Sequence, residues 1–193
     1  MKNRYNEILT LPNILTVYRL LLAPILYLTV TEGMQGLALF VFLLSGASDL
    51  ADGFLARRLG EVSRLGKILD PIADKLTYAL ALLALIPRIP PLGILLILLL
   101  IKEGVSTITS LIAIGRSSHI QGARIHGKIA GLVLWTTVFL HLLPLSLPKA
   151  ITIVTLCLSL TAMALSFALY LREHLSRNPK NERSIVEDFM SRM

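Results

Sequence analysis

Residues 48–75 read SDLADGFLARRLGEVSRLGKILDPIADK, and the interpretation of the whole chain starts from this stretch. It carries four aspartates at the inner ends of two strongly apolar runs: Asp49, Asp52, Asp70 and Asp74. Spacings of three and four residues place the first two on one helix face and the last two on another. A short basic turn joins the two helices. The stretch therefore predicts a helical hairpin with two acidic faces turned toward each other.

These aspartates predict a metal site. An acidic side chain at the centre of a membrane costs about 2.5–3.5 kcal/mol, so four converging carboxylates need protons or counter-ions. Carboxylate oxygens suit hard divalent cations, and two Mg²⁺ or Mn²⁺ ions would balance the four charges of Asp49, Asp52, Asp70 and Asp74. The sequence has no Cys/His cluster that would indicate zinc. A proton or divalent-cation transporter is the alternative use of the same carboxylates.

Composition places the chain in a membrane. Its 193 residues are 54% hydrophobic, which is too apolar for a soluble domain of this size. We predict an all-α integral membrane protein, a six-transmembrane-helix bundle with a polar active-site cavity facing the cytoplasm. The membrane domain covers residues 1–172, with an interfacial helix at 1–12, and a charged cytoplasmic tail covers 173–193. The predicted spans are residues 14–30, 34–57, 67–86, 91–115, 125–143 and 150–171.

Basic residues predict the orientation. The net charge is +7, and lysine and arginine lie mostly on one side of the predicted spans, whereas the other side has only Arg88 and Lys149. By the positive-inside rule, both termini and the acidic hairpin face the cytoplasm. We therefore expect a multi-pass protein of the cell membrane, the inner one where there are two. Because the basic residues flank membrane segments, we expect no nucleic-acid partner.

The spacing of these residues resembles a known family. The pattern Asp49-x₂-Asp52-Gly53-x₂-Ala56-Arg57-x₈-Gly66-x₃-Asp70-x₃-Asp74 matches the motif of the CDP-alcohol phosphatidyltransferases without a departure. The stretch Pro12-Asn13-x-Leu15-Thr16-x-x-Arg19 resembles that of the branch that makes phosphatidylglycerophosphate. The resemblance implies transfer of a phosphatidyl group from CDP-diacylglycerol to glycerol 3-phosphate with release of CMP. It also implies a homodimer. Phosphatidylglycerol, inositol phosphate and serine remain alternative acceptors.

The resemblance also assigns roles to residues. Asp49, Asp52 and Asp70 would bind metal, and Asp74 would do so and also accept the proton of the acceptor hydroxyl. CDP-diacylglycerol would be bound by Asp52, Gly53, Ala56, Arg57, Ser63, Gly66, Asn13 and Thr16. Some of these residues have simpler interpretations. Gly53 and Ala56 would also suit close helix packing, and Asn13 would suit a helix cap.

Basic residues outside the motif predict the acceptor site. A pocket for the phosphate of glycerol 3-phosphate would consist of Lys102, Arg116, Arg124, Lys128 and Arg19. The loop cations among them would equally serve as anchors for lipid headgroups. Lys102 and Arg19 lie within spans and need partners: Glu103 or a phosphate for Lys102, the acidic site or a phosphate for Arg19. Lys75 is turned about 100° from Asp74 on a helix, so we expect it to pair with a neighbouring helix.

Overall fold

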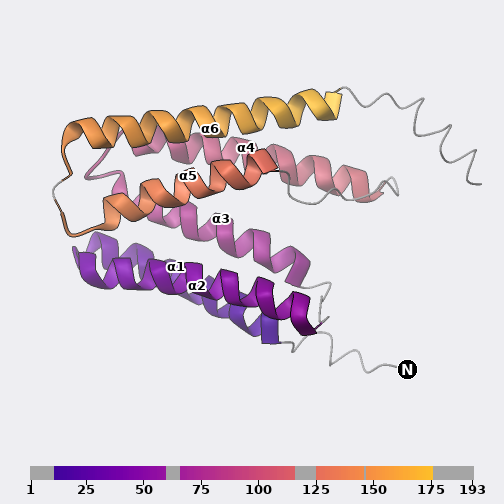
Figure 1. Cartoon of the computed structure of the whole chain (residues 1–193), viewed down its shortest axis with the longest axis horizontal. Coiled ribbons are helices and arrows are strands. Elements are labelled where there is room, and N and C mark those ends of the chain that lie inside the picture. Colours follow the sequence, from indigo (N-terminus) through magenta and orange to yellow (C-terminus); the bar gives the residue numbers. More distant parts are fainter. Residues whose placement is uncertain (1–10, 60–65, 116–124, 146, 176–193) are drawn as a thin grey trace, which may run out of the picture.

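The chain is described by a computed structural model that covers residues 11–59, 66–115, 125–145 and 147–175. Six helices lie in these ranges (Figure 1): α1 (Leu11–Thr31), α2 (Gln35–Leu59), α3 (Gly66–Leu85), α4 (Leu92–Gly115), α5 (Ile125–Leu142) and α6 (Lys149–Leu175). The all-helical prediction is confirmed. The helix bounds differ from the predicted spans by at most four residues, the largest difference being the end of α6 at 175 rather than 171. This last turn extends into the segment predicted as a tail.

Within the residues that the structure describes, three helical segments are long and apolar enough to cross a membrane: Asn13–Thr31, Ile125–Leu142 and Lys149–Arg172. A shorter apolar segment covers Gln35–Ala51 in α2. The remaining helices carry the charged residues: α3 contains Asp70, Asp74 and Lys75, and α4 contains Lys102 and Glu103. Membrane character is therefore shown for part of the bundle. The spans predicted for α2, α3 and α4 remain predictions.

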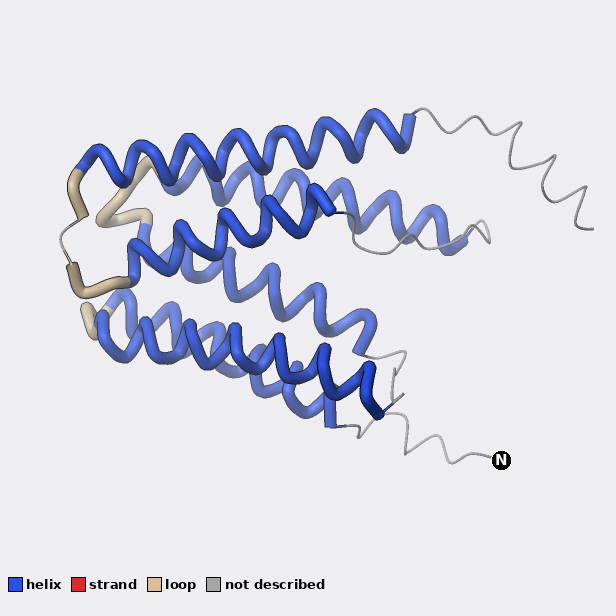
Figure 2. Tube along the Cα trace, in the orientation of Figure 1, coloured by secondary structure: helices blue, strands red, loops and turns tan. Residues whose placement is uncertain are grey.

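The helices run back and forth between two ends of an elongated bundle (Figure 1). The described turns that follow α1, α3 and α5 gather at one end, where they are tan in Figure 2. The opposite end holds the beginning of α1, the end of α2 and the beginning of α3. Because the acidic motif spans the end of α2 and the beginning of α3, this topology brings the motif next to the first turns of α1.

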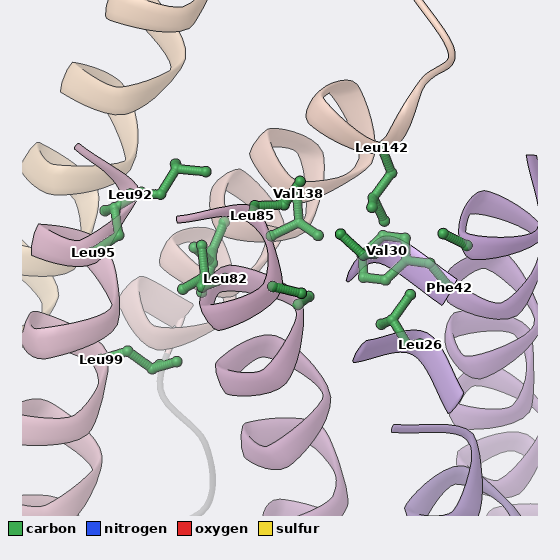
Figure 3. Packing of buried hydrophobic residues seen from close by; sticks show 14 of the residues in the cluster. Leu26, Val30, Phe42, Leu82, Leu85, Leu92, Leu95, Leu99, Val138 and Leu142 are labelled. Atoms are coloured by element: carbon green, nitrogen blue, oxygen red, sulfur yellow. The ribbon is translucent and has the colours of Figure 1, made fainter. Parts of the chain in front are cut away.

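One face of α1 is buried along its whole length and changes character half-way. Buried positions recur every three or four residues, which is the period of a helix packed on one side. They begin with Asn13, Thr16 and Arg19 and continue as Leu22, Ala23, Leu26 and Val30. The apolar half joins the main core with residues of α2, α3, α4 and α5, including Phe42, Leu82, Leu95 and Val138 (Figure 3). The polar half is thereby left to face the acidic motif.

A glycine turn fixes α2 against α1. Gly33 has φ of 78°, a conformation that costs least without a Cβ. The amide of Gly33 donates to the Val30 carbonyl at 3.2 Å, and the amide of Met34 donates to the Thr29 carbonyl at 2.9 Å, which is a Schellman ending. Arg88, from the turn after α3, also donates to the Val30 carbonyl at 3.1 Å. The three helices around the site are thus tied together at the end remote from it.

Candidate active site

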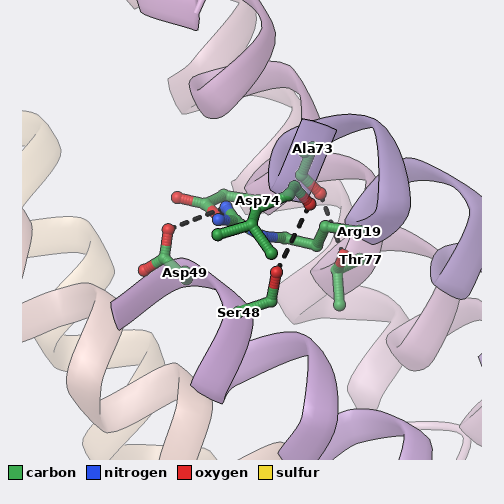
Figure 4. A network of polar contacts seen from close by, with 7 residues as sticks. Arg19, Ser48, Asp49, Ala73, Asp74 and Thr77 are labelled. Carbon is green, nitrogen blue, oxygen red and sulfur yellow. Dashed lines mark hydrogen bonds and ion pairs between the residues drawn. The ribbon is translucent and has the colours of Figure 1, made fainter. Parts of the chain in front are cut away.

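Arg19 joins the two acidic helices. Its Nη1 donates to Oδ1 of Asp49 on α2 at 2.7 Å and to Oδ1 of Asp74 on α3 (Figure 4). The two carboxylates therefore converge on one nitrogen, although they are 25 positions apart (74 minus 49). Arg19 is only 1% exposed. The predicted hairpin with facing acids is confirmed for this pair of aspartates.

Two hydroxyls next to these carboxylates donate hydrogen bonds to backbone carbonyls. Ser48 precedes Asp49, and its Oγ donates to the Leu15 carbonyl of α1 at 3.3 Å. Leu15 lies one helical turn before Arg19, so this bond ties α2 to α1 next to the ion pair. Thr77 lies three residues after Asp74 and donates to the Ala73 carbonyl at 2.9 Å. Neither hydroxyl was predicted from the sequence; a Ser or Thr within one turn of an intramembrane aspartate is the signal that would have indicated them.

The same carboxylates are open on their other side. The side chains of Asp49 and Asp74 are 45% and 42% exposed, in contrast to the buried Arg19 between them. Both carboxylates can therefore be reached from solvent. Two convergent, half-exposed carboxylates from different helices are a donor set that fits a hard divalent cation.

The rest of the acidic motif is described only by its backbone. Asp52 lies on α2 one turn after Asp49, and Asp70 lies on α3 one turn before Asp74, as the spacing predicted. Their side chains fall outside the described part. Among the side chains that the structure describes, no group of three potential metal ligands occurs, so the predicted four-carboxylate metal site stays a prediction.

A second charged network lies between α3 and α4. Lys75 Nζ is 2.9 Å from Glu103 Oε2, and Lys102 Nζ is 2.7 Å from Glu103 Oε1. The expectation that Lys75 pairs with a neighbouring helix is confirmed. Of the two partners considered for Lys102, the structure shows Glu103. Lys75, Lys102 and Glu103 together carry a net charge of +1. Lys75 directly follows Asp74 in α3.

The other predicted site residues are distributed as follows. Asn13 and Thr16 are 3% and 0% exposed on the buried face of α1 that also carries Arg19. Lys128 is exposed in the first turn of α5. Some residues have described helical backbones but undescribed side chains: Gly53, Ala56 and Arg57 on α2, and Gly66 at the beginning of α3. Ser63, Arg116 and Arg124 lie outside the described residues.

Comparison with known proteins agrees with the family that the acidic motif indicated. The sequence model of the CDP-alcohol phosphatidyltransferase family matches residues 9–171. A Streptomyces coelicolor protein named cardiolipin synthase (CMP-forming) is 44% identical over 101 residues, which are 49% of this chain and 47% of that protein. An Aquifex aeolicus protein named CDP-diacylglycerol–glycerol-3-phosphate 3-phosphatidyltransferase is 44% identical over 78 residues, 39% and 43% of the two chains.

A Rickettsia felis protein with the same name as the Aquifex protein is 32% identical over 117 residues, which are 59% of this chain and 57% of that protein. The aligned segments thus span about half or less of most of the curated relatives. The family match is broader, because it extends from just before α1 into α6 and includes the whole acidic motif. With Asp49 and Asp74 converging as that motif requires, the chain belongs to the CDP-alcohol phosphatidyltransferase family.

Proposed function

We propose that the protein transfers the phosphatidyl group of CDP-diacylglycerol to glycerol 3-phosphate, giving phosphatidylglycerophosphate and CMP. The observation that carries this proposal is the convergence of Asp49 and Asp74, half-exposed, within a complete family motif. A relative from Aquifex aeolicus bears the name of this activity. The transporter was considered as an alternative explanation of the four intramembrane carboxylates. Membership of this enzyme family explains them without a transport function.

In the proposed reaction, the acceptor hydroxyl attacks the phosphorus that carries diacylglycerol, and the bond from that phosphorus to the CMP oxygen breaks. Asp74 takes the hydroxyl proton, and CMP leaves with the bonding electron pair. Two divalent cations bound by Asp49, Asp52, Asp70 and Asp74 would neutralise charge on the pyrophosphate and the leaving group. Arg57 is proposed to contact a phosphate through its planar guanidinium.

The same proposal assigns the remaining nucleotide contacts. Asp52, Gly53, Ala56, Ser63 and Gly66 would lie against CDP-diacylglycerol, with the two glycines allowing the cytidine close to the backbone. Asn13 and Thr16 are buried in α1. Their proposed role is in binding CDP-diacylglycerol, on the face of α1 that also carries Arg19.

The acceptor phosphate is proposed to bind near the Lys75–Glu103–Lys102 network. Its surplus positive charge lies beside Asp74 in the chain, which suits an anionic acceptor whose hydroxyl must reach that carboxylate. Lys128 is exposed and would extend the pocket, with Arg116 and Arg124 as further predicted contributors. Phosphatidylglycerol is a second candidate acceptor, because the Streptomyces coelicolor relative is named a cardiolipin synthase.

The proposal includes the cellular setting. The six helices would all span the cell membrane, with both termini and the acidic site on the cytoplasmic side, where glycerol 3-phosphate and CMP are water-soluble partners. The alternation of helix direction supports one common end for the beginning of α1, the end of α6 and the motif (Figure 1). We also propose a homodimer, as the family resemblance implies. Crosslinking in native membranes followed by mass measurement tests the dimer.

Release of CMP by the purified protein in detergent tests the activity. We expect CMP to form with CDP-diacylglycerol, Mg²⁺ or Mn²⁺, and glycerol 3-phosphate, and to fall to background in EDTA because uncompensated carboxylates would repel the pyrophosphate. Readdition of Mn²⁺ should restore release. Release only with phosphatidylglycerol, inositol phosphate or serine would replace the proposed acceptor. No release with any acceptor, from protein shown to be folded, would overturn the proposal.

Charge changes in the acceptor pocket are expected to act on one substrate. Lys102→Gln and Lys128→Glu should each raise the KM for glycerol 3-phosphate about ten-fold, since each removes an attraction worth about 1.4 kcal/mol, and leave the KM for CDP-diacylglycerol nearly unchanged. Lys149→Glu is the matched control, because Lys149 is exposed at the opposite end of the bundle. Unchanged acceptor kinetics in both pocket variants would exclude these lysines from the pocket.

A further inference from the structure

We infer that Arg19 is the resident counter-ion of the metal-free acidic site, and that it competes with divalent cations for Asp49 and Asp74. This inference rests on the proposed function, because it supposes that these two carboxylates bind metal. Of the two partners that the sequence left open for Arg19, the acidic site and a substrate phosphate, it concerns the first. The affinity of the site for divalent cations therefore depends on Arg19, one buried side chain of α1.

The contacts of Arg19 place its charge on the metal ligands themselves. One nitrogen, Nη1, contacts an oxygen of Asp49 and an oxygen of Asp74. The guanidinium is 1% exposed, whereas the two carboxylates are 45% and 42% exposed. Arg19 therefore lies behind the carboxylates, and a cation from solvent would approach them from the open side. Arg19 and the cation would therefore be attracted by the same two carboxylates.

Burial explains why an arginine at this position needs these acids. A charged group inside a membrane bundle is costly unless it is paired, and an arginine does not lose its proton in a protein. Asp49 and Asp74 repel each other when no cation is present. A guanidinium between them is paired itself and cancels one of their two negative charges, which reduces the repulsion between the two helices.

Charge counting shows the competition. The four motif aspartates carry four negative charges, and Arg19 reduces their sum to three. Two divalent cations bring four positive charges, so the loaded site has a net charge of +1 with Arg19 and zero without it. The second cation therefore meets a net charge of −1 with Arg19, against −2 without it, and its binding leaves the site at +1. The pyrophosphate of CDP-diacylglycerol is negative, so its binding would offset that charge and favour the second cation.

Mn²⁺ binding to the purified full chain in detergent tests this inference without any turnover. The signal of free Mn²⁺ in electron paramagnetic resonance gives the amount bound at each concentration. We expect Arg19→Gln to bind Mn²⁺ roughly ten-fold more tightly than the unchanged protein, because a competing charge has been removed. Arg19→Lys keeps the charge and should stay within about two-fold of the unchanged protein. Arg88→Gln is the matched control, because Arg88 binds a backbone carbonyl at the remote end.

Thermal unfolding gives a second readout. Without metal, Arg19→Gln should unfold at a lower temperature than the unchanged protein, because its carboxylates repel each other uncompensated. Saturating Mn²⁺ should raise the unfolding temperature of Arg19→Gln by more than it raises that of the unchanged protein, since tighter binding stabilises more. This comparison also covers the case in which the variant folds only when Mn²⁺ is present throughout purification.

The outcomes separate this inference from the proposed function. Tighter Mn²⁺ binding by Arg19→Gln supports the inference. Equal or weaker binding overturns it, and would mean that Arg19 acts by positioning the carboxylates for metal; the proposed reaction would then stand unaffected. No Mn²⁺ binding by any variant, with all of them folded, overturns the inference together with the metal-dependent part of the proposed function.

Discussion

Asp74→Asn is expected to lower the rate of CMP release by about 10²–10⁴-fold, the usual contribution of a general base. Asparagine has the same shape as aspartate but accepts no proton at neutral pH, so the acceptor hydroxyl would keep its proton during attack. Binding of CDP-diacylglycerol should change by less than about ten-fold, because the nucleotide contacts are assigned to other residues. Turnover by CMP release and binding of labelled CDP-diacylglycerol measure the two effects on one protein preparation.

Asp49→Asn is the matched control for this prediction. Asp49 makes the same contact with Arg19 as Asp74 does, and the substitution removes the same charge. Its proposed role is metal binding alone, so excess Mn²⁺ should restore much of its lost activity, whereas Asp74→Asn should stay inactive at any Mn²⁺ concentration. Equal rescue of both variants, or equal loss of nucleotide binding and turnover in Asp74→Asn, would remove the special role of Asp74.

Local patterns in the sequence were sufficient for the helices and for part of the site. Apolar runs separated by Pro, Gly and charged residues defined all six helices to within four residues. Spacings of three and four residues placed Asp49 and Asp74 on facing helices, and the cost of an intramembrane charge required a partner for Arg19. These predictions succeeded because each depends on helix periodicity or on a large desolvation energy, both of which are properties of a short segment.

The contacts that depend on tertiary structure could not be predicted in the same way. Ser48 donates to Leu15, 33 residues away, and nothing in the local pattern of either segment specifies that pair. Lys102 had two acceptable partners, and only the packing of α4 shows that Glu103 takes this role while also pairing with Lys75. For Arg19, the sequence required a partner and left the acidic site and a substrate phosphate open, and the position of α1 between α2 and α3 shows its contacts with the acidic site.

Glu103→Leu is expected to destabilise the protein by about 1–3 kcal/mol, between the values for exposed and for fully buried ion pairs, because the network is partly exposed. Glu103 is the shared partner of Lys75 and Lys102, which are 34% and 17% exposed. Without it, two ammonium groups of adjacent helices would repel each other inside the bundle. Reversible unfolding in mixed detergent, followed by circular dichroism, measures the change. Glu32→Leu, which removes an exposed acid in the turn after α1, should stay within about 0.5 kcal/mol.

A second comparison distinguishes lost pairing from lost packing. The triple variant Lys75→Leu, Lys102→Leu, Glu103→Leu replaces the whole network by apolar side chains, and a buried ion network replaced in this way is often neutral for stability. We therefore expect the triple variant to regain most of the stability that Glu103→Leu loses. Its KM for glycerol 3-phosphate should still exceed that of the unchanged protein, because Lys102 is absent. A triple variant no more stable than Glu103→Leu would show that Glu103 stabilises the bundle through its packing. Recovered stability with an unchanged acceptor KM would show that the network joins α3 to α4 and has no part in acceptor binding.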